Sequence, residues 1–193
     1  MPAPAIDEMP PVFTHGDALE RGVSDRVLYG WRDSALIEQI ARGIFAQPGL
    51  PADLDLVEIA VRAPDATLCL TTALARHDLS DDIPPTIHAA LPRKRRAPRT
   101  AARVTWHRFD EDTFDIGRDE LTVYGDLTIG IYDPVRSIID AFRLRHRYGE
   151  DLAVGAVRRW LPRRGTEPSE LVEVARHFPV TGPSLRNVLQ ILL

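Results

Sequence analysis

The spacing of hydrophobic residues near the N-terminus predicts two short helices and a hairpin. Thr14, with an acid three residues later, is placed to cap the first helix, and Gly22 is placed to end it. Ser24 is the N-cap of a second helix over residues 25–33, whose apolar side chains recur at helical spacing. Residues 36–46 predict two strands around an Arg-Gly turn. Helix, tight turn, helix and hairpin is the layout of a winged helix-turn-helix, in which the second helix enters the major groove of DNA.

The rest of the chain mixes strands and helices. Short apolar runs predict strands over residues 67–70, 86–91, 103–109, 121–124 and 127–131. Helical periodicity predicts helices over residues 54–62, 71–77, 151–161, 169–178 and 184–193, and one more that begins at Pro134. Strands followed by a run of helices favour the α+β class.

A turn-rich segment, residues 47–51, marks a domain boundary. We therefore expect an α+β protein with a small N-terminal winged helix-turn-helix over residues 13–47. An α+β domain over residues 52–193 follows, with mixed strands and then a C-terminal helical bundle. Residues 1–12 are rich in proline and are expected to form a flexible leader.

Composition and charge exclude several kinds of site and of partner. The chain has 193 residues and a net charge of −4, which does not indicate a nucleic-acid binder by itself. Its only cysteine, Cys69, excludes an intramolecular disulfide and a cysteine-based zinc site. No stretch approaches the roughly 18 apolar residues of a membrane span, and the N-terminus lacks a secretory signal. We expect a cytoplasmic protein with no membrane partner.

Four blocks of sequence carry a resemblance to a known family. They are residues 13–46, residues 70–81 (LTTALARHDLSD), residues 83–92 (IPPTIHAALP) and residues 133–140 (DPVRSIID). In this order and spacing they resemble the AbiEi-type antitoxins of bacterial toxin–antitoxin operons. The resemblance implies that the N-terminal module binds inverted repeats in its own promoter DNA and represses the operon. It also implies that the second domain neutralises a cognate nucleotidyltransferase-type toxin by direct contact, without catalysis and without a cofactor.

Five residues are candidates for DNA contact under this interpretation. They are Ser24, Arg26, Tyr29, Arg32 and Arg42. Arginine binds guanine in bidentate fashion, and serine or tyrosine binds phosphate. The alternative is a helical hairpin that packs on the body of the protein, with a solvated outer face and an ordinary charged turn at Arg42.

Charge works against this module as a DNA binder. Residues 13–47 hold four arginines and five carboxylates, which leaves a net charge of −1. Nonspecific DNA affinity comes almost entirely from phosphate neutralisation, so this module should bind weakly alone. Three explanations stay open: contacts from a second basic segment, doubling of contacts by a homodimer on the inverted repeats, or loss of DNA binding. The last would leave a protein-only antitoxin.

The second basic segment is a loop with five cations, held extended by a proline near each end. The cations are Arg93, Lys94, Arg95, Arg96 and Arg99. This loop is a candidate for contact with DNA, RNA or an acidic toxin surface, and its alternative is an ordinary solvated loop. A small RNA-binding or enzymatic domain built around residues 93–108 is the less favoured function.

Other candidates for chemistry have structural explanations. His77 with Asp78, Asp81 and Asp82 supplies one imidazole and three acids, which are better explained as loop caps than as a metal site. Cys69 lies in an apolar run and is expected to be an inert buried thiol. We expect no catalytic residue and no metal site. The apolar face of residues 184–193 is expected to close the core, and a partner-binding surface is its alternative.

Overall fold

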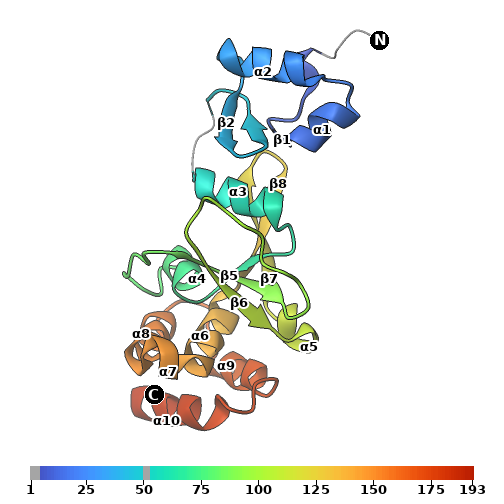
Figure 1. The fold of residues 1–193 in the computed structure, drawn as a ribbon. Helices are drawn as coiled ribbons and strands as arrows, with labels where there is room; N and C mark the ends of the chain where they lie inside the picture. Colours follow the sequence, from blue (N-terminus) through green and yellow to red (C-terminus); the bar gives the residue numbers. More distant parts are fainter. Residues whose placement is uncertain (1–4, 50–52) are drawn as a thin grey trace. The chain divides into compact units, whose positions relative to one another are not determined.

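The computed structural model describes residues 5–49 and 53–193, and it belongs to the α+β class (Figure 1). Its contacts divide the chain into two compact units. The N-terminal unit comprises Met1–Pro64, Arg99–Ala102 and Thr122–Thr128. The C-terminal unit comprises Asp65–Pro98, Arg103–Leu121 and Ile129–Leu193.

The N-terminal unit contains the predicted pair of helices and the predicted hairpin. Its first elements are η1 (Ile6–Glu8), β1 (Val12–Thr14), α1 (His15–Glu20), α2 (Asp25–Asp33), β2 (Glu38–Ala41) and β3 (Ile44–Ala46). The strands form an antiparallel sheet with β3 between β1 and β2. Strand β1 was not predicted, because it is three residues long and is defined only by its pairing with β3.

Local signals set the ends of these elements. Thr14 caps α1: its hydroxyl accepts the Asp17 N–H, and the Asp17 carboxylate accepts the Thr14 N–H at 2.7 Å. Gly22 follows α1 with φ +83°, and Gly43 turns the hairpin with φ +73°. The helices and sheet enclose a small apolar core formed by Met9, Phe13, Ala18, Val23, Leu28, Ile37 and Phe45.

The prediction of a flexible leader over residues 1–12 is wrong for residues 5–12. Met9 is buried in the small core, 4% exposed. The Gln47 side-chain amide donates to the carbonyl of Met9 at 3.0 Å and lies 3.4 Å from that of Ile6. These contacts join residues about forty positions apart in the chain, so no local sequence pattern predicts them. Residues 1–4 lie outside the described residues.

The structure also divides the chain differently from the predicted boundary at residues 47–52. Helix α3 (Leu54–Arg62) has the predicted bounds but belongs to the N-terminal unit. Its buried Glu58 accepts hydrogen bonds from the N–H groups of Ala101 and Ala102, at 2.8 and 2.9 Å. Burial tends to raise the pKa of Glu58, but these bonds and the Arg62 guanidinium lower it overall. The carboxylate therefore fixes residues 99–102 within this unit. Residue 52, the predicted start of the second domain, lies outside the described residues.

A mixed sheet of order β6-β5-β4-β8-β7 forms the base of the C-terminal unit, although residues 122–128, at the ends of β7 and β8, are assigned to the N-terminal unit. Its strands are β4 (Thr67–Leu68), β5 (Ile87–Pro92), β6 (Val104–Phe109), β7 (Arg118–Tyr124) and β8 (Leu127–Tyr132). Strand β5 runs parallel to β6 and antiparallel to β4, while β4 runs parallel to β8. The strand predicted over residues 67–70 is shorter, because Leu70, with φ +47°, begins a helix.

The predicted run of helices follows the sheet (Figure 1). The helices of this unit are α4 (Leu70–Arg76), α5 (Glu111–Phe114), α6 (Pro134–Arg143), α7 (Arg145–Tyr148), α8 (Glu150–Trp160), α9 (Pro168–Ala175) and α10 (Gly182–Leu192). Helix α6 packs against α4, α8 and α9 and is buried along most of its length. Leu185, Val188 and Leu189 of α10 are buried in the same core, which confirms the prediction that this helix closes the core. The one-turn helices α5 and α7 were not predicted, because four residues show no helical period.

Candidate functional site

The exposed face of α2 is the first candidate site, and Arg26 and Tyr29 lie on it. They are three residues apart, which places them on one face of the helix. Arg26 is exposed and forms no ion pair with any described residue. Ser24 is the exposed N-cap, and its side chain makes no capping hydrogen bond. The structure thus brings together three of the five residues predicted to meet DNA.

Arg32, the fourth candidate for DNA contact, is partly exposed but also makes contacts within the N-terminal unit. Its side chain is 38% exposed, and its Nη2 lies 2.8 Å from Oδ1 of Asp33. Its guanidinium also lies 4.8 Å from the centre of the Tyr29 ring and reaches Oε1 of Gln39 at 3.5 Å. Arg32 therefore holds Tyr29 and links α2 to β2, in addition to any role at the surface.

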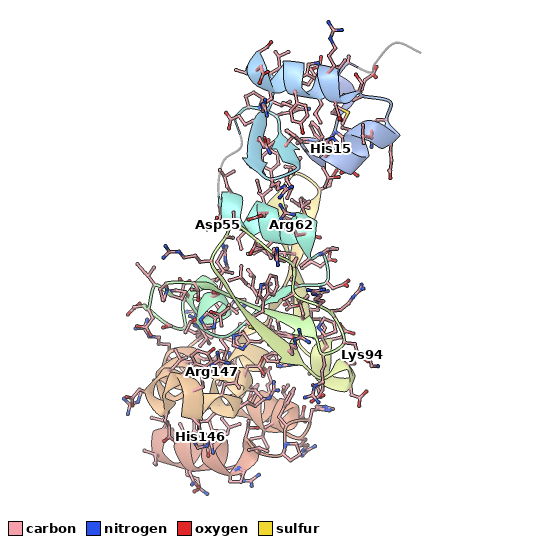
Figure 2. The ribbon with its side chains drawn as sticks, viewed as in Figure 1. His15, Asp55, Arg62, Lys94, His146 and Arg147 are labelled. Carbon is pink, nitrogen blue, oxygen red and sulfur yellow. The ribbon has the colours of Figure 1, made fainter. Side chains whose placement is uncertain are left out.

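A second polar contact fixes the start of α2. His15, labelled in Figure 2, is the first residue of α1. Its Nε2 lies 2.8 Å from Oδ1 of Asp25, the first residue of α2. Tyr29 packs between the His15 ring and Phe45 of β3, at centroid distances of 6.5 and 6.3 Å. The orientation of the exposed face is thus set by both α1 and the sheet.

Arg42 lies at the turn of the β2–β3 hairpin, as predicted, and its side chain is exposed. Its carbonyl accepts a hydrogen bond from Nη2 of Arg62 at 2.8 Å. Arg62 also pairs with Glu58, so the turn is connected to the buried carboxylate of α3. The guanidinium of Arg42 forms no ion pair with a described residue.

The charge of the N-terminal unit is more negative than that of residues 13–47. This unit contains six arginines and eleven carboxylates, which leaves −5. Two of these acids, Asp25 and Asp33, lie on α2 itself and are paired with His15 and Arg32. The field of the unit as a whole repels a polyanion.

The basic loop is largely neutralised by acids of the C-terminal unit. Arg93 pairs with Asp110 at 3.0 Å, Lys94 with Glu111 at 2.6 Å, and Arg95 with Asp65. The hydrogen bond to Glu111 raises the pKa of Lys94. Arg96 is exposed, with no partner among the described residues. Arg99 belongs to the N-terminal unit, so the predicted five-cation loop is divided between the two units.

The structure also reveals a buried charged cluster that the sequence reasoning missed. Arg136 and Asp140 are fully buried on α6 and bind each other, and Asp140 also binds Arg143. The guanidinium groups of Arg136 and Arg143 each lie within 4.7 Å of the centre of the Phe178 ring. The four-residue spacing of Arg136 and Asp140 was the available signal, but burial could not be seen from the sequence.

A pair of buried histidines lies on β5 and β6. Nδ1 of His88 lies 3.1 Å from Nε2 of His107, and Tyr148 packs edge-on against both rings. Burial, the neighbouring His88 and Arg147 lower the pKa of His107 to about 4. Burial also lowers the pKa of His88. Both imidazoles are therefore neutral at physiological pH, and they belong to the core.

The other polar candidates have structural roles. Nε2 of His77 lies 2.8 Å from the Tyr132 carbonyl, and Asp81 pairs with Arg159. Burial raises the pKa of the Cys69 thiol well above its usual range, as expected for an inert side chain. Within residues 5–49 and 53–193, no group of three or more His, Cys, Asp or Glu side chains could hold a metal ion. Across the same residues, no helix combines the length and apolarity that crossing a bilayer requires.

Comparison with known proteins places the fold. No family model matches the chain, and no curated protein matches its sequence. Among solved structures, the crystal structure of the Rv2827c protein from Mycobacterium tuberculosis is similar, with a TM-score of 0.57 and 17% sequence identity. The match covers 88% of this chain and 68% of that protein. At this identity the likeness concerns the fold alone.

Proposed function

We propose that this protein is an antitoxin that binds operator DNA through its N-terminal unit and a toxin through its C-terminal unit. The observation that carries the DNA-binding half is the exposed face of α2. This face presents Arg26 without an ion-pair partner, next to Tyr29 and the free N-cap hydroxyl of Ser24. The hairpin with Arg42 at its turn completes the proposed winged helix-turn-helix, with α2 as the recognition helix.

Specific rather than nonspecific binding follows from the charge. A unit with a net charge of −5 gains little from phosphate neutralisation alone. Base contacts by Arg26 and the pairing of two half-sites by a homodimer are therefore proposed to supply the affinity. Inverted repeats in the protein's own promoter are the expected operator.

The test is fluorescence anisotropy on the upstream promoter DNA at low and moderate salt. The Arg26→Ala variant should bind about tenfold more weakly, since a bidentate base contact contributes roughly 1–3 kcal/mol. Arg164→Ala is the matched control, because Arg164 is exposed and lies in the other unit. Arg32→Ala is a poorer test, because it also removes the contacts of Arg32 with Tyr29 and Asp33. Equal loss in the Arg26 and Arg164 variants would count against α2 as the recognition helix.

The proposed toxin is a protein of the nucleotidyltransferase type, and inhibition is by contact. Within the basic loop, Arg96 is the cation proposed to reach it, because Arg93, Lys94 and Arg95 already have carboxylate partners. Co-purification with the product of a neighbouring toxin gene tests the partner. Arg96→Glu should weaken toxin neutralisation, and unchanged neutralisation would remove the loop from the interface.

A protein-only antitoxin is the second candidate, and the charge of −5 on the N-terminal unit favours it. A protein-only antitoxin should not raise the anisotropy of promoter DNA at any salt concentration, and it should neutralise the toxin fully. The proposed DNA-binding antitoxin should bind promoter DNA with an affinity that falls as the salt concentration rises. The two candidates are separated by the same anisotropy measurement.

A further inference from the structure

The junction between α9 and α10 encloses a hollow with two arginines. Its volume is about 380 Å³, and it lies wholly within the C-terminal unit. Arg176 follows α9, and Arg186 lies on the second turn of α10. Neither guanidinium forms an ion pair or hydrogen bond with a described side chain, although most exposed cations of the basic loop do.

The position of Arg186 is electrostatically unusual. A Cβ placed on Gly182, the first residue of α10, would lie 3.3 Å from Nη1 of Arg186, so the guanidinium lies over the start of its own helix. The N-terminal end of a helix carries partial positive charge and favours anions rather than cations. The first turn of α10 contains no acid, and the side chain of Thr181 does not cap it. The hollow thus gathers two exposed arginines, and neither has a carboxylate partner within ion-pair distance among the described residues.

The lining also limits what kind of anion fits. Val172, Pro179 and Leu185 supply apolar surface beside the two arginines. A single carboxylate next to an apolar group fits both the arginines and the apolar lining. The planar guanidinium binds carboxylates through two parallel hydrogen bonds, and the apolar group can pack against the lining.

We propose that the hollow between α9 and α10 binds a glutamate or aspartate side chain of a protein partner, with an adjacent apolar side chain of that partner against its lining. This inference rests on the proposed function in one respect, that the C-terminal unit binds a protein. Arg176 and Arg186 would grip the carboxylate, and the free N–H groups of Gly182 and Ser184 would lie next to it. These groups precede the first hydrogen bond of α10, from the Leu185 N–H to the Thr181 carbonyl.

The experiment is an NMR titration of the full ¹⁵N-labelled chain with three probes. They are the blocked tripeptide acetyl-Leu-Glu-Leu-amide, its Gln analogue, and inorganic phosphate. We expect the acidic peptide to shift the amide resonances of Gly182 and Ser184 saturably, and the Gln analogue to leave them in place. The double variant Arg176→Gln, Arg186→Gln should weaken binding at least tenfold, whereas Arg164→Gln, which alters an exposed arginine elsewhere, should not.

Three outcomes would overturn the proposal: equal shifts with the Gln analogue, phosphate binding as tight as peptide binding, or unchanged affinity in the double variant. Arg186→Lys gives a second test that preserves charge, and it should weaken binding because the ammonium lacks the planar fork. Unchanged resonances outside the hollow would show that each variant is folded. The titration uses neither DNA nor toxin, so a failed operator-binding experiment leaves its result standing.

Discussion

Arg136 and Asp140 form an ion pair with both side chains fully buried, Nε to Oδ2 at 3.1 Å. Nη1 of Arg136 donates to the carbonyls of Thr113 and Ile116, at 2.6 and 2.7 Å. Its guanidinium lies over the rings of Tyr132 and Phe178. One side chain therefore joins α6 to the α5 segment and to the residues that lead into α10.

Removal of one partner of this pair should be more harmful than removal of both. Asp140→Leu leaves the Arg136 charge buried without its carboxylate, and we expect a loss of about 3–5 kcal/mol in the free energy of unfolding. The double variant Arg136→Met, Asp140→Leu should lose less than Asp140→Leu alone, although two carbonyls then lack their donor. Urea unfolding of the wild type, Asp140→Leu, Arg136→Met and the double variant measures this. Additive losses would show that the two residues act independently.

The buried histidine pair predicts a loss of stability in acid. His107 has a pKa of about 4 in the folded protein, and an unfolded chain has a value near 6.5. The unfolded state therefore binds more protons between these values, so stability is full above about pH 6.5 and falls as pH is lowered toward 4. The expected loss from this group is about 3 kcal/mol at pH 4. The measurement is the free energy of unfolding as a function of pH.

A pair of variants distinguishes the contribution of His107 to this acid-induced loss of stability from that of carboxyl groups that titrate in the same pH range. His107→Gln should flatten the decline between pH 6.5 and 4, while His146→Gln, which changes an exposed imidazole, should retain it. An unchanged slope in the His107 variant would mean that other groups cause the decline.

The two helix starts in the N-terminal unit should respond differently to loss of a hydroxyl. Thr14 accepts a backbone hydrogen bond from Asp17, and Thr14→Ala should cost about 1 kcal/mol. Ser24 makes no capping bond, so Ser24→Ala should change stability much less. Thermal unfolding compares the two. If Ser24→Ala were instead the more damaging change, the description of the α2 cap would be incorrect.

Two glycines with positive φ should differ in their tolerance of alanine. Gly117 has φ +66°, and an added Cβ would lie 2.7 Å from Cβ of Arg136 and 2.8 Å from Oδ2 of Asp133. Gly165 has φ +79° in open space. Gly165→Ala should therefore cost only the roughly 1–2 kcal/mol of a left-handed backbone, and Gly117→Ala should cost more because it also displaces the α6 cap. Equal losses in urea unfolding would contradict the steric argument.

The elements that the sequence predicted correctly are those that local interactions determine. The helices over residues 25–33 and 54–62 have the predicted bounds, and the hairpin turns at the predicted Arg42 and Gly43. Caps, glycine turns and apolar periods act between residues three or four apart, so they can be seen in the chain itself. For the same reason Ser24, Arg26 and Tyr29 were placed correctly at an exposed helix start.

Tertiary structure alone decided which charges and strands meet. Three cations of the basic loop pair with acids 17 or 30 residues away, and the carbonyl of buried Met9 accepts a hydrogen bond from the Gln47 side chain. Arg32 turns toward Tyr29 and Gln39, and Glu58 draws residues 99–102 into the N-terminal unit. A charge or an apolar side chain specifies the kind of partner that it needs but not its position in the chain. That position is set only when the whole chain buries its apolar surface and pairs its buried polar groups.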